Sequence, residues 1–413
     1  MVAYHFPPLA GSSGIQRTLR FAQHLPALGW QPLVLSASAR AYEMTSDDLM
    51  GDVPPGMVVR RAFALDTARH LTIAGRYMAW MARPDRWVSW RFDAVRQGMA
   101  LIRQFKPDVI WSTYPIATAH LIAHSLHRRS GIPWVADFRD PMAQDGYPAD
   151  RITRDHFLRI EAVAADQAAS CVFTTPGAAQ DYRQRYPAAA DRMVVLENGY
   201  DEESFQSAGA SPSPTEARAG DAPLVLLHSG IVYPSERDPI QLFVALRRLR
   251  DAGRMRGDAV RIRFRASVHD ALLSRLAAEH GVSEFIELAP PIAYREALAE
   301  MLSVDGLMVM QASNCNAQIP AKIYEYLRAG KPIVGLTDPL GDTAGVLRGA
   351  GLTAIARLDS ADEIVEVLAT FVDDLRQGRG LTPTPESVAA ASRQGRTSAL
   401  AGLLDRATLD SAR

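Results

Sequence analysis

The sequence contains only two cysteines, Cys171 and Cys315, among 413 residues. They are too few for a disulfide framework and too far apart for a metal-binding pair. We therefore expect a protein of a reducing compartment, the cytoplasm. The sequence also lacks an apolar run of about 18 residues, which argues against a membrane-spanning helix, and no signal peptide is recognisable.

An excess of charge of one sign is missing as well. The 45 basic and 46 acidic residues give a net charge of -1, whereas general nucleic-acid binding requires a strong basic excess. We expect no nucleic-acid partner. The motifs D-x-D, H-x-x-x-H with acids, and C-x-x-C are all absent, so the sequence predicts no metal site and no metal cofactor.

What is present is the composition of a soluble globular protein, with 47% hydrophobic and 22% charged residues. The length fits two domains of about 150 to 200 residues each. Two series of apolar strands alternate with helical segments, which predicts parallel sheets covered on both faces. The predicted strands are 1–4, 31–36, 58–61, 109–112, 134–137, 171–174 and 193–196, then 224–228, 262–266, 285–288, 306–310, 333–336 and 353–355.

This alternation indicates the α/β class with two doubly wound, Rossmann-like domains, at residues 1–200 and 223–380. Ligands of such sheets bind outside the carboxyl ends of the strands. Residues 201–222 are rich in Ser, Pro, Ala and Gly, which predicts an exposed linker. The polar, Ala-rich tail at 381–413 is predicted to be helical. Because the first predicted strand begins at Met1, we expect the natural start of the chain to lie upstream.

The most informative segment is residues 319–335, IPAKIYEYLRAGKPIVG, which predicts a short helix, a Gly turn and a buried strand. Lys322 and Glu325 share one face near the positive end of that helix. A lysine at a helix N-terminus suits phosphate, and a glutamate one turn further suits a pair of sugar hydroxyls. A solvated surface Lys–Glu pair is an equally simple interpretation.

This segment resembles the donor-binding helix of glycosyltransferases with the GT-B fold, especially family four. The family motif is Glu-x7-Glu followed by Ala-Gly-x-Pro-Val. Glu325 matches the second Glu, which in the family holds the nucleotide ribose, but Ala317 stands at the position of the first. A subset of the family has Pro-x-Lys-x-x-Glu-Tyr here, and this sequence follows that subset.

The first predicted strand leads into a Gly-rich turn at residues 5–14, HFPPLAGSSG. Glycines let a backbone approach a ligand closely, although a plain turn is the alternative. The spacing is not G-x-G-x-x-G, which argues against a dinucleotide. The turn resembles the family's Pro-Pro-x-x-Gly-Gly-x-x-x-Arg, and the resemblance implies that it reaches the acceptor and the transferred sugar through Gly11, Ser12, Ser13 and Gly14.

A charged loop follows the predicted strand at 134–137. Its residues Arg139 and Asp140 lie at the carboxyl end of that strand, where ligands of such sheets bind. An Asp there could act as a base or orient an acceptor hydroxyl, and a local salt bridge is the alternative. The sequence is similar to the Asp-x-Arg-Asp-Pro-Trp of one family branch, with Met142 replacing the Trp. His120, on the helix predicted at 117–129, is a further catalytic candidate or an ordinary helix residue.

Two more segments complete the resemblance. Residues 198–205 match the family's Asn-Gly-x-Asp-x-x-x-Phe at the boundary between the domains. After the strand at 224–228, Gly230 permits close backbone approach and Arg237 could pair with a diphosphate. The family has both Arg and Lys in this loop, so the resemblance implies that Arg237 shares the diphosphate with Lys322. A solvated loop arginine is the alternative.

Trp80, Trp87 and Trp90 lie among arginines in residues 76–91. Aromatic and basic residues together suit a membrane interface or a lipid-linked acceptor, and helices packed on a sheet edge are the alternative. We therefore expect a protein that is cytoplasmic or peripheral on the inner face of the membrane.

The resemblance covers nearly the whole chain and implies a GT-B glycosyltransferase whose domains face each other across a cleft, with a C-terminal helix crossing back. It would move a sugar, of hexosyl type, from a nucleotide-sugar to a glycan or lipid-linked acceptor in surface polysaccharide synthesis, without a metal and with retention. A nucleotide-sugar epimerase of the same architecture remains an alternative. So does a degenerate transferase-like binding subunit, because of Ala317.

Overall fold

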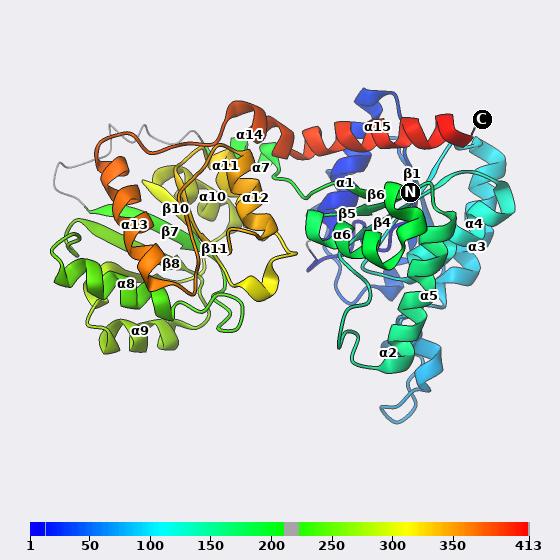
Figure 1. Ribbon diagram of the computed structural model, residues 1–413. Coiled ribbons are helices and arrows are strands. Elements are labelled where there is room, and N and C mark those ends of the chain that lie inside the picture. Colours follow the sequence, from blue (N-terminus) through cyan, green and yellow to red (C-terminus); the bar gives the residue numbers. More distant parts are fainter. Residues whose placement is uncertain (13, 210–222, 412–413) are drawn as a thin grey trace. The chain divides into compact units, whose positions relative to one another are not determined.

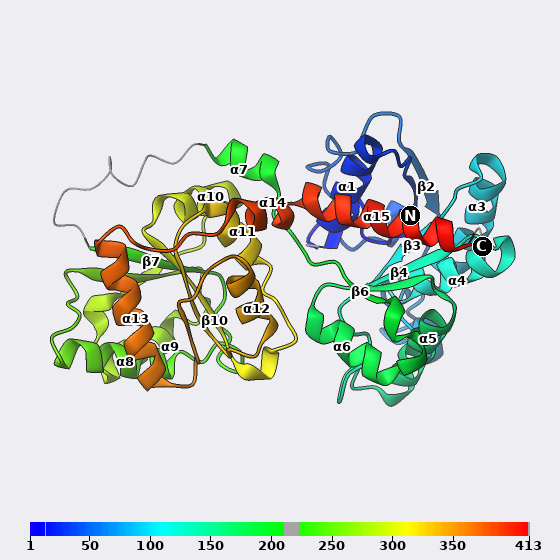
Figure 2. The same ribbon diagram turned by 45° about the horizontal axis from the view of Figure 1, so that its top comes forward.

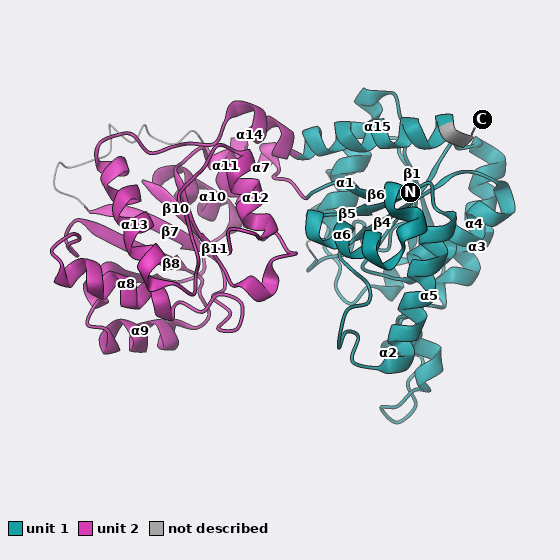
Figure 3. Ribbon diagram, viewed as in Figure 1, with its two compact units in different colours: residues 1–197, 393–413 teal, residues 198–392 magenta. Residues whose placement is uncertain are grey.

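The computed structural model describes residues 1–12, 14–209 and 223–411, which divide into two compact units. Unit 1 consists of Met1–Glu197 and Arg393–Arg413, and unit 2 of Asn198–Ser392 (Figure 3). Each unit has a parallel sheet with helices on both of its faces (Figures 1 and 2). The predicted α/β class with two Rossmann-like domains is confirmed.

In unit 1, the pair β1–β2 and the sheet β3–β4–β5–β6 flank residues 1–3. Val2 N–H donates to the Trp111 carbonyl (2.7 Å), and Leu35 N–H donates to the Met1 carbonyl (2.8 Å). The predicted strand 1–4 is therefore an extended segment held by isolated bridges. The strands are β1 (Leu33–Ala37), β2 (Val58–Ala62), β3 (Ile110–Thr113), β4 (Trp134–Arg139), β5 (Ser170–Phe173) and β6 (Met193–Val195).

Alternate residues of these strands pack against different helices, as the two-residue period of a strand requires. Val135 and Val172 belong to the cluster that contains Leu400 and Leu404 of α15. Their neighbours Ala136 and Phe173 belong to the cluster on the α3–α6 side. The helices of unit 1 are α1 (Gly14–His24), α2 (Thr67–His70), α3 (Trp90–Phe105), α4 (Thr118–Ser130), α5 (Arg151–Gln167), α6 (Pro176–Arg185) and α15 (Arg393–Ser411).

Unit 2 contains one parallel sheet with the order β12-β11-β10-β7-β8-β9. Its first strand, β7, lies between β10 and β8, so the strand order reverses there, and the carboxyl ends of β7 and β10 mark the switch point where such sheets bind ligands. The strands are β7 (Leu224–Ser229), β8 (Val260–Arg265), β9 (Ile286–Ala289), β10 (Gly306–Gln311), β11 (Ile333–Thr337) and β12 (Ile355–Ala356).

Helices cover both faces of this sheet. One apolar cluster joins it to α8, α9 and α13, and a second joins it to α7, α10, α11, α12 and α14. The bounds are α7 (Glu202–Ala208), α8 (Ile240–Asp251), α9 (Asp270–Glu279), α10 (Tyr294–Ser303), α11 (Lys322–Ala329), α12 (Asp342–Gly349), α13 (Ala361–Arg376) and α14 (Pro385–Ala391). Within the described ranges, no helix is both long and apolar enough to cross a membrane.

The prediction of a linker over the whole of 201–222 is wrong at its start. Glu202–Ala208 forms α7, since Phe205 is buried in a cluster of unit 2 and Arg328 pairs with Glu202. The composition of the segment did not predict this helix, because only one buried ring and one ion pair hold it in place. Residues 210–222 lie outside the described residues. Unit 2 also takes in α14, which falls within the predicted tail.

Candidate functional site

The candidate donor site lies at the switch point of unit 2, where α11 begins beside the loop that follows β7. Tyr326 of α11 accepts a hydrogen bond from the Ser229 N–H (2.8 Å) through its hydroxyl oxygen. His228, just before, is buried and its Nδ1 lies 3.1 Å from the Met308 carbonyl oxygen of β10. The first contact holds α11 against the carboxyl end of β7, and the second joins β7 to β10.

Lys322 is the first residue of α11, and its ammonium lies against Gly230. A Cβ at Gly230 would lie 2.8 Å from Nζ, and the φ of Gly230 is +111°, so only glycine fits there without strain. The Nζ atom is buried and has no hydrogen-bond partner among the described residues. Burial, together with the nearby Arg237 charge, lowers the pKa of Lys322 to about 7, and Glu325 opposes this shift.

Arg237 is held in the loop after β7. Its guanidinium donates to the Ile231 carbonyl and lies 5.3 Å from the ring centroid of Tyr233. It is near enough to lower the pKa of Lys322. Two cations therefore gather at one end of the sheet, and one of them is an ammonium without a partner, which is the arrangement that an anionic group such as a diphosphate would satisfy.

Glu325 lies one turn along α11 from Lys322 and accepts a hydrogen bond from the Tyr294 hydroxyl (2.8 Å) at Oε1. A carboxylate held in this way presents acceptor positions to paired hydroxyls. Ala317, at the position of the first Glu of the family motif, is exposed in the segment before α11 and offers no polar side chain. The predicted donor residues Gly230, Arg237, Lys322 and Glu325 are thus brought together.

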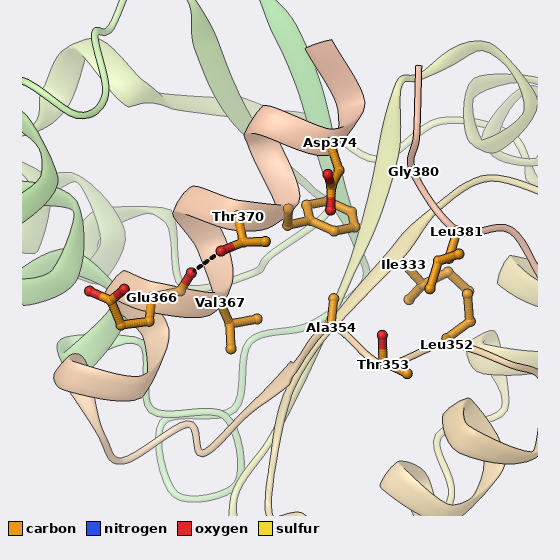
Figure 4. Close-up of a pocket in the computed structure, with 11 residues that line it drawn as sticks. Ile333, Leu352, Thr353, Ala354, Glu366, Val367, Thr370, Asp374, Gly380 and Leu381 are labelled. Atoms are coloured by element: carbon orange, nitrogen blue, oxygen red, sulfur yellow. Dashed lines mark hydrogen bonds between the residues drawn. The ribbon is translucent and has the colours of Figure 1, made fainter. Parts of the chain in front are cut away.

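Two cavities of unit 2 are lined by residues outside this group of donor residues. One of about 390 Å³ lies at the same edge of the sheet and is lined by Gln311 and Asp338, among others. Another of about 280 Å³ lies between α13 and the start of β11 (Figure 4). Its carboxylates, Glu366 and Asp374, already pair with arginines at 2.9 Å, so it offers no unpaired charge to a ligand.

In unit 1, the charged end of β4 contains a buried ion pair that the sequence analysis did not predict. Both carboxylate oxygens of Asp137 accept hydrogen bonds from Arg17, at 2.9 and 3.1 Å. Arg17 also donates to the Leu196 and Glu197 carbonyl oxygens, and the Thr113 hydroxyl donates to Asp137. Both oxygens of the Asp137 carboxylate are thus occupied by Arg17 and Thr113. Asp137 therefore holds α1 against the sheet and does not act as a catalytic acid or base.

Arg139 and Asp140 follow Asp137, and no ion pair joins their side chains in the part of the chain that the structure describes. A register shift between Asp137 and Arg139 and a φ of +62° at Arg139 turn the chain sharply. Asp140 is exposed, and its Oδ1 accepts a hydrogen bond from the Thr174 hydroxyl at 3.3 Å. The alternative of a local Arg139–Asp140 salt bridge is therefore wrong.

The Gly-rich turn lies directly beside Arg139. A Cβ at Gly14 would meet the Arg139 Nη1 atom at 2.8 Å and His5 Nδ1 at 2.4 Å. Ser12 Oγ lies 3.1 Å from His5 Nδ1 and accepts a hydrogen bond from the Gly14 N–H. Burial, and then the Arg139 charge, lowers the pKa of His5 to about 4, so His5 is neutral near pH 7.

Within this turn, Gly11 has a φ of +75°, which suits glycine. Ser13 lies outside the described residues. The turn and the end of β4 thus bring the predicted residues Gly11, Ser12, Gly14, Arg139 and Asp140 into one region of unit 1, together with His5, which the sequence analysis did not single out. Its place at the first residue of the turn was the available signal.

His120 is not accessible from the region that contains the Gly-rich turn and the end of β4. It is fully buried on α4, its Nδ1 lies 2.8 Å from Ser112 Oγ, and its ring packs against Phe138 at 4.8 Å between centroids. Burial lowers the pKa of His120 to about 4. The structure therefore gives no support for a contact between His120 and a sugar hydroxyl, since helix packing against β4 accounts for its position.

The match to a known protein family lies almost entirely within unit 1. Residues 13–199 match the family model of the glycosyl transferase 4-like domain. No curated protein matches the sequence of the chain. The match to the family model therefore covers most of unit 1, including the turn at 11–14 in part and the end of β4.

Solved structures match along nearly the whole chain. The sucrose-phosphate synthase of Thermosynechococcus elongatus is 14% identical with a TM-score of 0.58, covering 98% of this chain and 95% of that one. Anabaena HepE in complex with UDP is 14% identical with a TM-score of 0.58, covering 98% and 96%. The trehalose 6-phosphate synthase of Burkholderia multivorans is 14% identical with a TM-score of 0.59, covering 100% and 96%.

The match to the family model confirms the family resemblance over residues 13–199. At such low identity, the solved structures establish the fold of the chain. Residues 13–199 therefore resemble a glycosyl transferase 4-like domain, and over nearly its whole length the chain has the fold of these solved structures, the GT-B fold.

Proposed function

We propose that the protein is a hexosyl-type glycosyltransferase that moves a sugar from a nucleotide-sugar donor to a glycan or lipid-linked acceptor. The observation that carries this proposal is the buried, unpartnered ammonium of Lys322 between Gly230 and Arg237, with Glu325 one turn away. Lys322 and Arg237 would hold the diphosphate and Glu325 the ribose. HepE, a protein of the same fold, was solved with UDP and with UDP-glucose.

In this proposal, the bond between the anomeric carbon and the diphosphate breaks while the acceptor hydroxyl bonds to that carbon on the same face and passes its proton to the leaving diphosphate, with retention of configuration. The electron pair goes to the leaving diphosphate, which the two cations of unit 2 stabilise. Asp140 would orient the acceptor hydroxyl. The setting would be cytoplasmic, at the inner face of the membrane, in the synthesis of a surface polysaccharide.

A panel of nucleotide-sugars in a thermal-shift assay tests the donor class directly. A ligand present at 100 times its dissociation constant should stabilise the protein by about 2.7 kcal/mol. A matched donor must then support transfer or slow hydrolysis. Binding without any turnover would favour a degenerate binding subunit, and interconversion of the sugar without an acceptor would favour an epimerase.

Glu325→Ala is expected to weaken binding of the matched donor by about 2 kcal/mol, roughly 30-fold, because a charge-assisted acceptor is lost. Calorimetry on the folded variant measures this. Tyr294→Phe is the matched control, since it removes only the hydroxyl that donates to Glu325. Unchanged affinity in Glu325→Ala would remove Glu325 from the donor site.

Turnover is expected to survive treatment with EDTA. The sequence has no D-x-D motif, and Lys322 and Arg237 supply the positive charge that a metal would otherwise bring to the leaving group. The assay compares rates before and after chelation. Complete loss of activity that Mg²⁺ or Mn²⁺ restores would contradict the metal-independent reaction.

A further inference from the structure

An apolar segment extends from unit 1 immediately after α2 and is exposed at every residue from 73 to 80, here called the tip segment. Ile73 is 84% exposed, Trp80 66%, Met78 62% and Tyr77 41%. In Figure 1 this light-blue part of the chain points away from the rest of unit 1. Large side chains gathered in this way on a soluble surface mark an interaction site.

The shape of the tip segment is fixed by local hydrogen bonds. The backbones of Ile73 and Arg76 donate to each other at 2.9 and 3.0 Å, and the two residues between them, Ala74 and Gly75, have φ values of +50° and +76°. This is a tight turn with left-handed central residues. The Thr67 hydroxyl holds the base by donating to the Met81 carbonyl at 2.8 Å. The apolar side chains are therefore presented on a defined support.

The charge around the tip segment is positive. Residues 67–84 contain Arg69, Arg76 and Arg83 and no aspartate or glutamate. Arg83 pairs with Asp150 at 3.1 Å, and Arg69 donates to a backbone carbonyl. The side chain of Arg76 has no hydrogen bond or ion pair within the described ranges. The cation nearest the turn is thus available to a negatively charged partner.

The structure also divides the cluster of Trp80, Trp87 and Trp90 that the sequence analysis treated as one. Trp90 is fully buried, and Trp87 lies 4.8 Å from Tyr4 between ring centroids, so these two pack inside unit 1. Only Trp80 faces solvent, since it belongs to the short 3-10 helix Ala79–Ala82 of the tip segment. The exposed apolar surface therefore lies ahead of residues 84–91.

We propose that the tip segment docks unit 1 on an anionic lipid surface. Trp and Tyr favour the membrane interface, and Ile73 and Met78 can enter the boundary between headgroups and acyl chains. Arg76 can extend its stem along apolar surface while its head meets lipid phosphates. This inference adds a docking surface to the proposed function and does not depend on the transfer reaction itself.

The test is flotation of the full chain with two kinds of vesicle, phosphatidylcholine alone and phosphatidylcholine with phosphatidylglycerol. We expect binding to the anionic vesicles that weakens as salt rises. The double variant Ile73→Ser with Trp80→Ser should bind about tenfold less because interfacial apolar area is lost. Arg76→Gln should bind about fivefold less at low salt, the effect of one cation near an anionic surface.

Two control variants keep the test specific. Leu340→Ser removes an apolar side chain that is 92% exposed in unit 2, and Arg103→Gln removes an exposed arginine in the last turn of α3. Both should bind vesicles as the unchanged protein does. Vesicles with brominated acyl chains should quench a part of the tryptophan fluorescence that is missing in Trp80→Ser.

Each other outcome overturns the proposal. It fails if the chain does not float with anionic vesicles, or if the tip variants and the controls bind equally. A dimer in sedimentation that Trp80→Ser dissolves would assign the segment to a second copy of the chain instead. Donor binding and turnover are measured on the same preparations. Loss of vesicle binding with normal turnover would contradict the docking surface but not the proposed function. Normal vesicle binding without turnover would contradict the proposed function but not the docking surface.

Discussion

Replacement of Lys322 by glutamine is expected to weaken binding of the matched nucleotide-sugar by about 10- to 100-fold near pH 6.5, the scale of a hydrogen bond to a charged group. The buried ammonium has no hydrogen-bond partner in the described part of the chain, so an arriving diphosphate would supply the acceptors that it lacks. Glutamine keeps a donor of similar length but removes the charge.

The dependence on pH distinguishes this role from simple packing. Lys322 has a pKa of about 7, so its charged fraction falls steeply above neutrality. Because the diphosphate binds the charged form, donor affinity should fall about 20-fold between about pH 6.5 and about pH 8.5. In Lys322→Gln the affinity should change little over this range. Calorimetry at several pH values measures both.

Stability of the ligand-free protein should move in the opposite direction. Lys322 titrates at about 7 in the folded chain and near its usual 10.5 when unfolded, so the unfolded state binds more protons between these values. Its contribution to the free energy of unfolding therefore rises with pH through that window. Lys106→Gln, at an exposed lysine, is the control for the loss of a lysine charge.

A donor affinity that is insensitive both to pH and to Lys322→Gln would exclude Lys322 from the donor site.

Asp140→Asn is expected to lower turnover by about 10² or more, the scale of a positioned acid–base group. Asp140 is exposed in the region of the Gly-rich turn, and among the described residues its side chain accepts a hydrogen bond only from Thr174. Donor affinity should stay constant, since the proposed donor residues belong to unit 2. The melting temperature should change little, because no ion pair with Arg139 is broken.

The measurement combines turnover, donor affinity and melting temperature on one preparation. Asp145→Asn is the matched control, since Asp145 is an exposed acid in the same loop. Normal turnover in Asp140→Asn would rule out its catalytic assignment. So would a loss of activity that only follows a loss of stability.

The sequence was most predictive where local pattern alone determines structure. The strand predicted at 333–336 agrees with β11 to within one residue, and the short helix predicted within residues 319–335 is α11, because a buried apolar run, Pro320 and Gly330 mark their ends. The family resemblance grouped Gly230 with Lys322 in the donor site, and the structure places the Lys322 ammonium against Gly230.

What the sequence could not predict are the partners that lie far along the chain. Asp137 and Arg17 are 120 residues apart, and a charged strand end does not reveal which neighbour neutralises it. His120 and Trp90 are buried against residues of other elements, which their own segments do not reveal. α7 depends on Arg328, which no local pattern connects to Glu202.

The division of the chain also has a consequence for biosynthesis. Unit 2 is one continuous segment, whereas the core of unit 1 includes Leu400 and Leu404 packed with Phe21 and Trp111. During translation, all of unit 2 is therefore synthesised before the last helix that unit 1 requires. Until the end of translation, the part of unit 1 that is made first therefore lacks the apolar side chains of α15 that belong to its core, so unit 1 completes this core last.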